Sequence, residues 1–474
     1  MAMHTLTTID GRSSSLSEAL VNELATSMKG KLVMPADTDY DATRAIWNAM
    51  IDRRPGLIAR CANADDIARC VQFARRHKLL VAVRGAGHNI AGNAVCDGGL
   101  MLDLSPMKGI QVDPAKRVAK VEPGVTLGEL DTATQAHALA TPLGINSTTG
   151  VAGLALGGGF GWLSRKFGLT VDSLLAADVV TADARRLRVS QDSSPDLFWA
   201  IRGGGGNFGV VSSFEFRLHP VGPEVLAGLI VHPFADARGL LQQYRELTAK
   251  APDDLTVWVV MRKAPPLPFL PAEYHGKEVL VFAACYAGAI PEGERALKPL
   301  RALGKPIADV IGPMPFAGWQ TAFDPLLTPG ARNYWKSHNF PALGDELIDI
   351  LRRYIDKLPT PLSEIFIGQM GGASGRIASD ATAYAQRDAA YVMNVHTRWE
   401  SASDDARCIA WARELFEATR PFATGGVYVN FMPFDEGDRV ESAYGKNYER
   451  LLVLKRKYDP DNLFRMNQNI RPDA

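Results

Sequence analysis

The chain has 474 residues, of which 46% are hydrophobic and 22% are charged, so we expect a globular protein of two or three domains. Lys and Arg together number 52, as do Asp and Glu, and this balance excludes a strong net field that would attract nucleic acid or an anionic membrane. The 5 cysteines form no C-x-x-C pair, which argues against a disulfide framework or a zinc site. We therefore expect no bound metal.

The N-terminal segment lacks the charged and apolar regions of a secretory signal. No window reaches the roughly 18 apolar residues of a membrane-spanning helix. The expectation is a cytoplasmic protein with reduced cysteines and no membrane partner, and its oligomeric state is left open.

Residues 1–220 are predicted to alternate between strands and helices. A helix at 63–77 begins with Asn63 and two acidic residues, and its apolar residues recur on one face. A buried strand at 79–84 leads directly into a glycine-rich loop. The other predicted strands are 56–60, 100–104, 109–112, 117–121, 176–181, 186–190 and 210–218, and the other helices are 126–137 and 196–201.

Residues 221–425 have a different sequence pattern, which predicts strands separated by amphipathic helices. This order predicts an α+β layer, an antiparallel sheet covered by helices on one face. The predicted strands are 224–232, 256–261, 278–286, 364–370 and 391–399, and the helices are 236–249, 291–303, 345–358 and 403–419. The proline-rich stretch 265–271 is expected to be a rigid surface loop. Beyond it, 427–431 is predicted as a strand, 445–457 as a helix and 459–462 as a turn.

Three glycine-rich stretches carry the functional signal: R-G-A-G-H-N at 84–89, G-V-A-G-L-A-L-G-G-G-F-G at 150–161, and R-G-G-G-G-N-F-G at 202–209. Glycine lets the backbone approach a phosphate or a flat ring closely, so three such stretches predict a large anionic ligand such as a dinucleotide. A single glycine loop is more often only a tight turn. The G-x-G-x-x-G at 204–209 follows a helix and precedes a strand, which excludes the usual Rossmann arrangement.

On these motifs the chain resembles the berberine-bridge-enzyme-like family, within the vanillyl-alcohol-oxidase superfamily of FAD enzymes. The resemblance continues through G-G-G-F-G-W-L-S-R-K-F-G-L-T-V-D-S, L-F-W-A-I-R-G-G-G-G-N-F-G-V-V and the C-terminal Y-D-P-D-N-L-F-R-M-N-Q-N-I. It implies a PCMH-type FAD-binding domain at 1–220, with its core at about 54–220. A substrate-binding domain would follow at 221–425, and a C-terminal segment at 426–474 would return to the first domain.

The resemblance also implies the residues around the cofactor. His88 would be bonded through a ring nitrogen to the flavin, and such bonds raise the flavin potential in the family. Loop amides near His88 would hold the pyrophosphate, and other residues would line the rest of the FAD. The implied contacts are Arg84, Gly85, Ala86, Gly87, Asn89, Gly92, Asn93, Asn146, Thr149, Gly150, Gly153, Gly157, Gly158, Gly161, Val210, Tyr428, Asn430 and Asn467.

Three positions depart from the pattern of many relatives. Asn146 stands where they carry a second flavin-linking cysteine, so we expect one covalent bond, as in the bacterial 6-hydroxy-D-nicotine oxidase type. Phe431 stands where they carry a tyrosine that serves as the base or assists it, and Val392 stands where plant members carry a glutamate. The small Thr149, near the position that controls oxygen access in relatives, favours an oxidase.

The proton acceptor must then come from elsewhere, or the substrate must arrive neutral and need none. Alternation along 391–399 places Asn394 and His396 on the face of Val392, and His396 has a suitable chemistry for proton abstraction. An equal alternative is that His396 is a structural residue whose hydrogen bonds are satisfied at the edge of the sheet. Tyr428 is a third candidate, which would hold the flavin or the substrate, and the segment 334–336 could also reach the pocket.

These features predict an FAD-dependent oxidase with O2 and a small molecule as its partners. A C–H bearing oxygen or nitrogen, in an alcohol, sugar or amine, would give hydride to flavin N5, and O2 would be reduced to H2O2. The alternatives are a dehydrogenase with another electron acceptor and a flavin-binding sensor with reduced catalysis.

Overall fold

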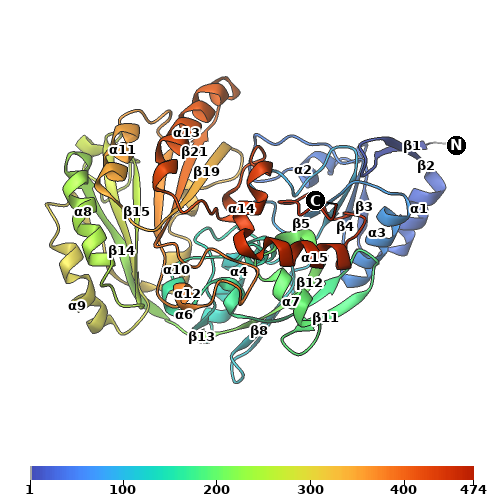
Figure 1. Cartoon of the computed structure of the whole chain (residues 1–474), viewed down its shortest axis with the longest axis horizontal. Helices are drawn as coiled ribbons and strands as arrows, with labels where there is room; N and C mark the ends of the chain where they lie inside the picture. Colours follow the sequence, from blue (N-terminus) through green and yellow to red (C-terminus); the bar gives the residue numbers. More distant parts are fainter. Residues whose placement is uncertain (1–2, 474) are drawn as a thin grey trace.

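The computed structural model describes residues 3–473 and shows an elongated molecule that combines helices with several sheets (Figure 1). One end holds the N-terminal strands, and the other end holds a large antiparallel sheet with its helices. Among the described residues, no helix has both the length and the apolar character needed to cross a bilayer.

The N-terminal end is built on a small, mostly parallel sheet covered by helix α3 (Ala64–Arg76). As predicted, Asn63 caps this helix, its side chain accepting a 3.0 Å hydrogen bond from the Asp66 N–H. The apolar face of α3 packs on the strands, where each fully buried side chain contributes about 1.5–3 kcal/mol. The elements are β1 (Met3–Thr7), β2 (Ser13–Ser17), α1 (Glu18–Ser27), β3 (Lys31–Val33), α2 (Tyr40–Arg44), β4 (Leu57–Arg60), β5 (Val81–Arg84) and β6 (Leu100–Asp103).

A five-stranded antiparallel sheet follows, in the order β11-β10-β12-β8-β7. Its core includes residues from the C-terminal helix α15, so the end of the chain packs against this part of the molecule. The strands are β7 (Ile110–Asp113), β8 (Val118–Val121), β10 (Leu174–Val180), β11 (Arg186–Ser190) and β12 (Val210–Arg217), with the short pair β9 (Leu139–Ala140) and β13 (His219–Pro220) beside them. The helices are α4 (Leu127–Gln135), α5 (Val151–Leu156), α6 (Ser164–Phe167) and α7 (Pro195–Ile201).

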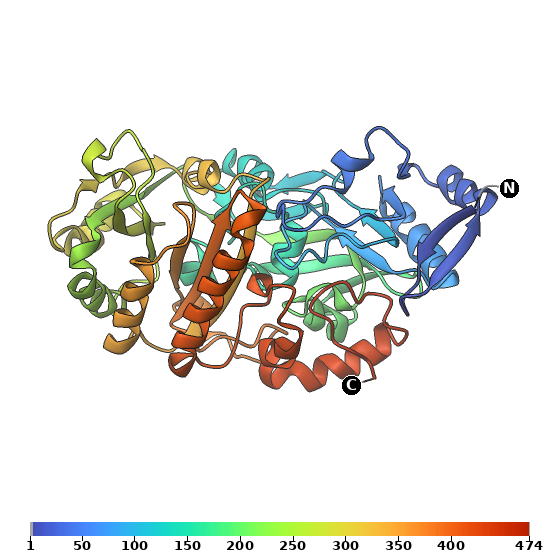
Figure 2. The same cartoon turned by 90° about the horizontal axis from the view of Figure 1, so that it is seen from above.

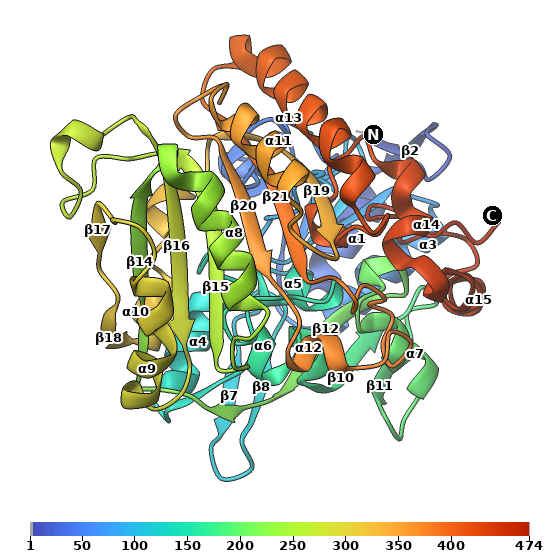
Figure 3. The same ribbon diagram turned by 60° about the vertical axis from the view of Figure 1, so that its left-hand side comes forward.

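The far end is an eight-stranded sheet in which every pairing is antiparallel, as predicted. Figure 3 shows α8, α11 and α13 lying across one face of it. Their buried leucines and aromatic residues form one core with that face. The strands are β14 (Glu224–Pro233), β15 (Leu255–Lys263), β16 (Glu278–Tyr286), β17 (Ala308–Asp309), β18 (Gly312–Pro315), β19 (Arg332–Phe340), β20 (Glu364–Gln369) and β21 (Tyr391–Trp399), and the helices are α8 (Ala237–Thr248), α9 (Ile290–Arg301), α10 (Phe316–Gln320), α11 (Asp345–Ile355), α12 (Ala373–Arg376) and α13 (Asp405–Thr419).

The opposite face of this sheet meets the N-terminal half of the molecule. Trp258 of β15 stacks on Trp162 from the N-terminal half, with ring centroids 4.1 Å apart. These rings belong to a mixed core that also contains Phe160, Phe316 and Tyr428. The two halves are therefore joined by buried aromatic surface, and the candidate site lies within this junction.

The C-terminal segment runs along the N-terminal half of the molecule, in red in Figure 2. The predicted strand at 427–431 is wrong, because the structure has a 3-10 turn at Val429–Phe431. The segment pairs with no sheet; instead Asn430 donates to the Leu154 carbonyl at 3.2 Å. The helices beyond are α14 (Val440–Tyr444) and α15 (Tyr448–Tyr458). The domain boundaries at 220 and 425 stay predictions.

Candidate functional site

The site is a chamber of about 350 Å³ between the glycine-rich stretches and the inner face of the large sheet, the face that meets the N-terminal half of the molecule. We call it the main chamber. All three glycine-rich stretches contribute to its wall, the second one partly as the short helix α5 rather than as a loop alone. Predicted cofactor contacts that line it are Gly85, Ala86, Gly87, His88, Asn89, Asn93, Asn146, Thr149, Gly150, Gly153, Gly157, Val210, Tyr428, Asn430 and Asn467.

The backbone at the first loop suits an anionic ligand. Gly87 has φ +77, a conformation that side chains disfavour. Within residues 3–473, the N–H groups of Ala86, Gly87 and His88 donate to no other protein atom. A Cβ on Gly150 would lie 2.9 Å from the Ala86 nitrogen, so only glycine allows these two stretches to approach. Free amides beside bare backbone are the donors that a pyrophosphate requires.

Buried polar atoms in the chamber wall also fit a large polar ligand. Asn394 Oδ1, Asn467 Oδ1 and the indole N–H groups of Trp258 and Trp335 are buried without a partner in the described part of the chain. Such atoms are costly unless a bound group satisfies them. The donor set and the glycine cradle therefore fit a dinucleotide.

His88 lies in the chamber with its ring stacked on Trp47, the centroids 5.2 Å apart. The Thr148 hydroxyl is 2.9 Å from His88 Nε2 and donates a hydrogen bond of 2.7 Å to Asn146 Oδ1. The hydroxyl is thus an acceptor toward the ring, which places the imidazole proton on Nε2 and the lone pair on Nδ1. Burial lowers the pKa of His88 to about 4, so the ring is neutral at pH 7 and Nδ1, which lies 3.4 Å from the Thr149 hydroxyl, keeps its lone pair.

The inner face of the large sheet presents a row of hydrogen-bonding side chains across four strands. The strand register aligns Arg262, Glu364, His396 and Trp335 side by side. His396 Nδ1 is 3.1 Å from Glu364 Oε1, and the other carboxylate oxygen accepts from Arg262 at 2.8 Å. Burial alone would raise the pKa of Glu364, but the Arg262 charge and the His396 hydrogen bond outweigh it and hold the pKa below its ordinary value. Glu364 is therefore a carboxylate that orients His396.

Asn394 and His396 both line the main chamber, as the alternation along 391–399 predicted. Arg398, two residues further, lies over the Trp47 ring at 5.4 Å. Trp335 also reaches the chamber, whereas its neighbours Tyr334 and Lys336 contact Asp435 on the other side of β19.

Tyr428 is held as an acceptor. Its hydroxyl oxygen accepts from the Gly159 N–H at 3.2 Å and from Asn430 Nδ2 at 2.9 Å. Burial raises the pKa of Tyr428 well above its ordinary value, so this phenol stays protonated. The Tyr428 ring packs against Phe160 and Phe431 and forms part of the chamber wall. Its hydrogen bond from Gly159 holds the second glycine-rich stretch in place.

Four predicted cofactor contacts lie away from the chamber wall. Arg84 turns its guanidinium to Asp103, 2.8 Å away, and to backbone carbonyls. Gly92 closes a turn with Asn89, and Gly158 has φ +114 behind Tyr384. Gly161 passes so close to the Leu143 carbonyl that a Cβ would lie 1.7 Å from it. These residues determine the shape of the loops but do not line the chamber.

Several chamber residues were not predicted from the sequence. Glu364 was assigned only to a strand, because its partner His396 is 32 positions away and meets it through strand register. The aromatic residues Trp47, Trp258 and Phe366 belong to no motif that distinguishes a wall residue from a core residue.

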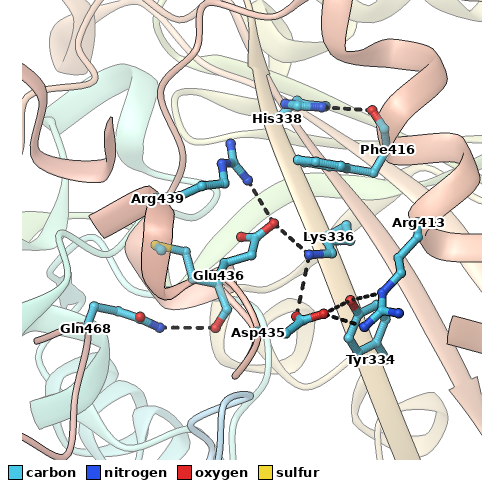
Figure 4. Close-up of polar contacts among 10 residues, drawn as sticks. Tyr334, Lys336, His338, Arg413, Phe416, Asp435, Glu436, Arg439 and Gln468 are labelled. Atoms are coloured by element: carbon cyan, nitrogen blue, oxygen red, sulfur yellow. Dashed lines mark hydrogen bonds and ion pairs between the residues drawn. The ribbon is translucent and has the colours of Figure 1, made fainter. Parts of the chain in front are cut away.

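A buried ionic cluster fixes the loop that follows Phe431 (Figure 4). Lys336 on β19 donates to Glu436 at 2.9 Å, and Glu436 also accepts from Arg439 at 2.9 Å. Tyr334 donates to Asp435 at 2.7 Å. The large sheet thus holds the loop that continues from the chamber wall.

Comparisons with known proteins agree with this geometry. A family model described as FAD binding domain matches residues 55–190, and one described as berberine and berberine like matches residues 427–471. An uncharacterized FAD-linked oxidoreductase of Bacillus subtilis, YgaK, is 32% identical over 94% of this chain and 98% of its own length. The chain belongs to the berberine-bridge-enzyme-like family of FAD-linked oxidoreductases.

Two further relatives extend the comparison. The (R)-6-hydroxynicotine oxidase of Paenarthrobacter nicotinovorans is 31% identical over 96% of this chain and 99% of its own length. A crystal structure of 6-hydroxy-D-nicotine oxidase from Arthrobacter nicotinovorans matches with a TM-score of 0.86 and 30% identity, covering 96% of this chain and 100% of that one. The predicted α+β, PCMH-type fold and the predicted FAD-dependent oxidoreductase activity are confirmed.

Proposed function

We propose that this enzyme is an oxidase that carries its FAD on a single covalent bond from His88. The observation that carries the proposal is the position of that ring, which lies in the chamber wall beside the first glycine loop, stacks on Trp47 and has Nε2 2.9 Å from the Thr148 hydroxyl, so that Nδ1 is left for the flavin. Asn146 offers an amide where a second link would need a thiolate, so one bond forms. The contacts predicted for the pyrophosphate are the free amides of the first glycine loop.

When bound, FAD accepts hydride from a substrate carbon and is reoxidised by O2, which gives H2O2. The chain supplies position and proton transfer. His396 Nδ1 lies 3.1 Å from the Glu364 carboxylate, which holds the ring in the chamber wall, where it would take a substrate O–H proton. Nε2 lies 3.4 Å from Asn333 Oδ1, so both ring nitrogens face an acceptor, and this arrangement would stabilise the imidazolium that proton abstraction forms.

Anaerobic mixing with alcohols, sugars and amines tests the proposal, because bleaching of the flavin band requires hydride transfer. The reduced enzyme should then reoxidise rapidly in air-saturated buffer with one H2O2 per turnover. Slow reoxidation would instead assign a dehydrogenase, and failure of every donor to bleach the flavin would assign a binding protein.

His396→Gln tests the proton acceptor. The variant should reduce the rate of flavin bleaching by alcohols about 10²–10⁴-fold, the usual contribution of a general base. Neutral amines need no base and should lose much less. His137→Gln, at an exposed histidine, is the matched control and should leave both rates unchanged. Equal losses for alcohols and amines would contradict the role of His396.

A further inference from the structure

A second cavity of about 70 Å³ opens beside the main chamber. We call it the side pocket. The two cavities share wall residues, among them Trp258, Glu364 and Phe366, so the side pocket continues the main chamber rather than forming a separate site. None of the sequence motifs pointed to it.

The floor of the side pocket is the same sheet face that carries His396. Strand register places Val231, Val281, Val260, Phe366 and Asn394 in one row. Along this row the side chain is polar at Asn394, beneath the main chamber, and aliphatic from Val260 to Val231, beneath the side pocket. A ligand that lies across the sheet meets hydrogen-bonding groups at one end and mostly hydrocarbon at the other, where the indole N–H groups of Trp162 and Trp258 are the exceptions.

The roof of the side pocket is the proline-rich loop, which was expected only to be a rigid surface segment. Its Leu267, Phe269 and Leu270 pack over the valines of the floor. The charged residues in the wall, Arg262 and Glu364, neutralise each other across 2.8 Å at the boundary with the main chamber. The interior of the side pocket thus offers no free charge to a ligand.

We propose that the side pocket binds a short apolar arm of the substrate, so that the substrate class is alcohols or amines bearing an alkyl group near the reacting carbon. This inference rests on the proposed function. A cavity of about 150 Å³ holds benzene, so the side pocket has room for roughly three carbons. Sugars are disfavoured, because most of their hydroxyl groups would be buried there without partners.

The test uses the holoenzyme and straight-chain primary alcohols and primary amines of two to eight carbons. Anaerobic bleaching gives kcat/KM, and the quenching of tryptophan fluorescence by the same compounds gives Kd without turnover. Each methylene that enters the side pocket should improve both quantities about fourfold, the value of burying one CH2, until the pocket is full.

Two variants change the size of the pocket in opposite directions. Ala283→Leu adds carbons between Trp258 and Leu229 on the floor, and it should abolish the gain from the last three or so methylenes. Phe269→Ala shortens the roof and should move the optimum to longer chains. Ala302→Leu, at an exposed position outside the pocket, is the matched control, and retained flavin absorbance shows that each variant is folded.

The outcomes separate the two proposals. Chain-length dependence of Kd that Ala283→Leu removes, without bleaching by any donor, would support the side pocket and overturn the oxidase. Bleaching that is independent of chain length and unchanged by either variant would overturn the side pocket and leave the oxidase intact. Preferred bleaching by sugars, or a lack of binding by every alcohol and amine, would also overturn the side pocket.

Discussion

At the scale of single residues, the protonation pattern of the His88 ring depends on two consecutive hydrogen-bonding contacts, which we call the relay. Asn146 orients the Thr148 hydroxyl by accepting its hydrogen bond, and that hydroxyl in turn favours one imidazole tautomer. Asn146, at the position where the resemblance implies a second flavin-linking cysteine, thus contributes to the orientation of His88. It orients the ring nitrogen proposed to bind flavin.

Thr148→Val tests this relay by removing the hydroxyl while keeping the shape of the side chain. The loss of one hydrogen bond, about 1 kcal/mol, should slow covalent attachment of FAD to apoprotein about fivefold. The time course of acid-stable flavin fluorescence measures the rate. Thr148→Ser keeps the hydroxyl and should behave as the wild type; equal rates in Val and Ser variants would contradict the relay.

Sequence reasoning located the chamber residues that lie close together in the chain or alternate along one strand. The loop around His88 and the pair Asn394 and His396 are examples. Glu364 could not be assigned to the site, because the register between β20 and β21 brings it to His396 and register is a property of the assembled sheet.

At the scale of elements, strands with alternating or continuously apolar residues were predicted closely, and β16 and β21 match their predicted bounds. The strand β19 was missed. It carries Lys336 and His338, and both are buried, because Glu436 binds the Lys336 ammonium and the Phe416 carbonyl binds His338 Nε2 from elements distant in sequence. A polar strand whose partners are remote has no local pattern that identifies it.

The contact between α4 and α10 predicts a dependence of stability on pH. Burial raises the pKa of Asp131 to about 7, although a hydrogen bond from Gln320 opposes the shift. The folded state therefore holds this proton more tightly than the unfolded state. Its contribution to stability is complete below about pH 4 and is lost as the pH rises to about 7.

Asp131→Asn should remove this dependence, because an amide can donate to the unpartnered Gln320 Oε1 at any pH. The variant should have a higher Tm than the wild type at pH 8, and the difference should shrink toward pH 5. Thermal unfolding across this range is the measurement. Asp192→Asn, at an exposed carboxylate, is the control, and an Asp131→Asn difference that is constant with pH would contradict the argument.

At the scale of the whole molecule, a buried ionic cluster is one of the contacts that hold the C-terminal segment on the FAD-binding half. Lys455 donates to Asp459 at 2.6 Å and to the carbonyls of Asn207 and Phe464, each at 3.0 Å. This connects α15 to the third glycine-rich stretch and to the residues just before Asn467, which lines the main chamber.

Lys455→Met should destabilise the protein by about 3–5 kcal/mol, because Asp459 would remain buried without its cation. Denaturant unfolding measures the change. Lys457→Met, which removes an exposed ion pair with Asp196, should leave the midpoint nearly unchanged. Equal, small effects of the two substitutions would contradict a role of the buried cluster in holding the segment.

The most direct test of the account is the mass of the denatured, purified protein. If His88 carries the cofactor, the intact mass should exceed that of the polypeptide by one FAD, and the proteolytic fragment containing His88 should hold the flavin. The His88→Ala variant should release all its flavin on acid denaturation. Complete release of flavin from the wild type, or flavin retained by the variant, would contradict the covalent link.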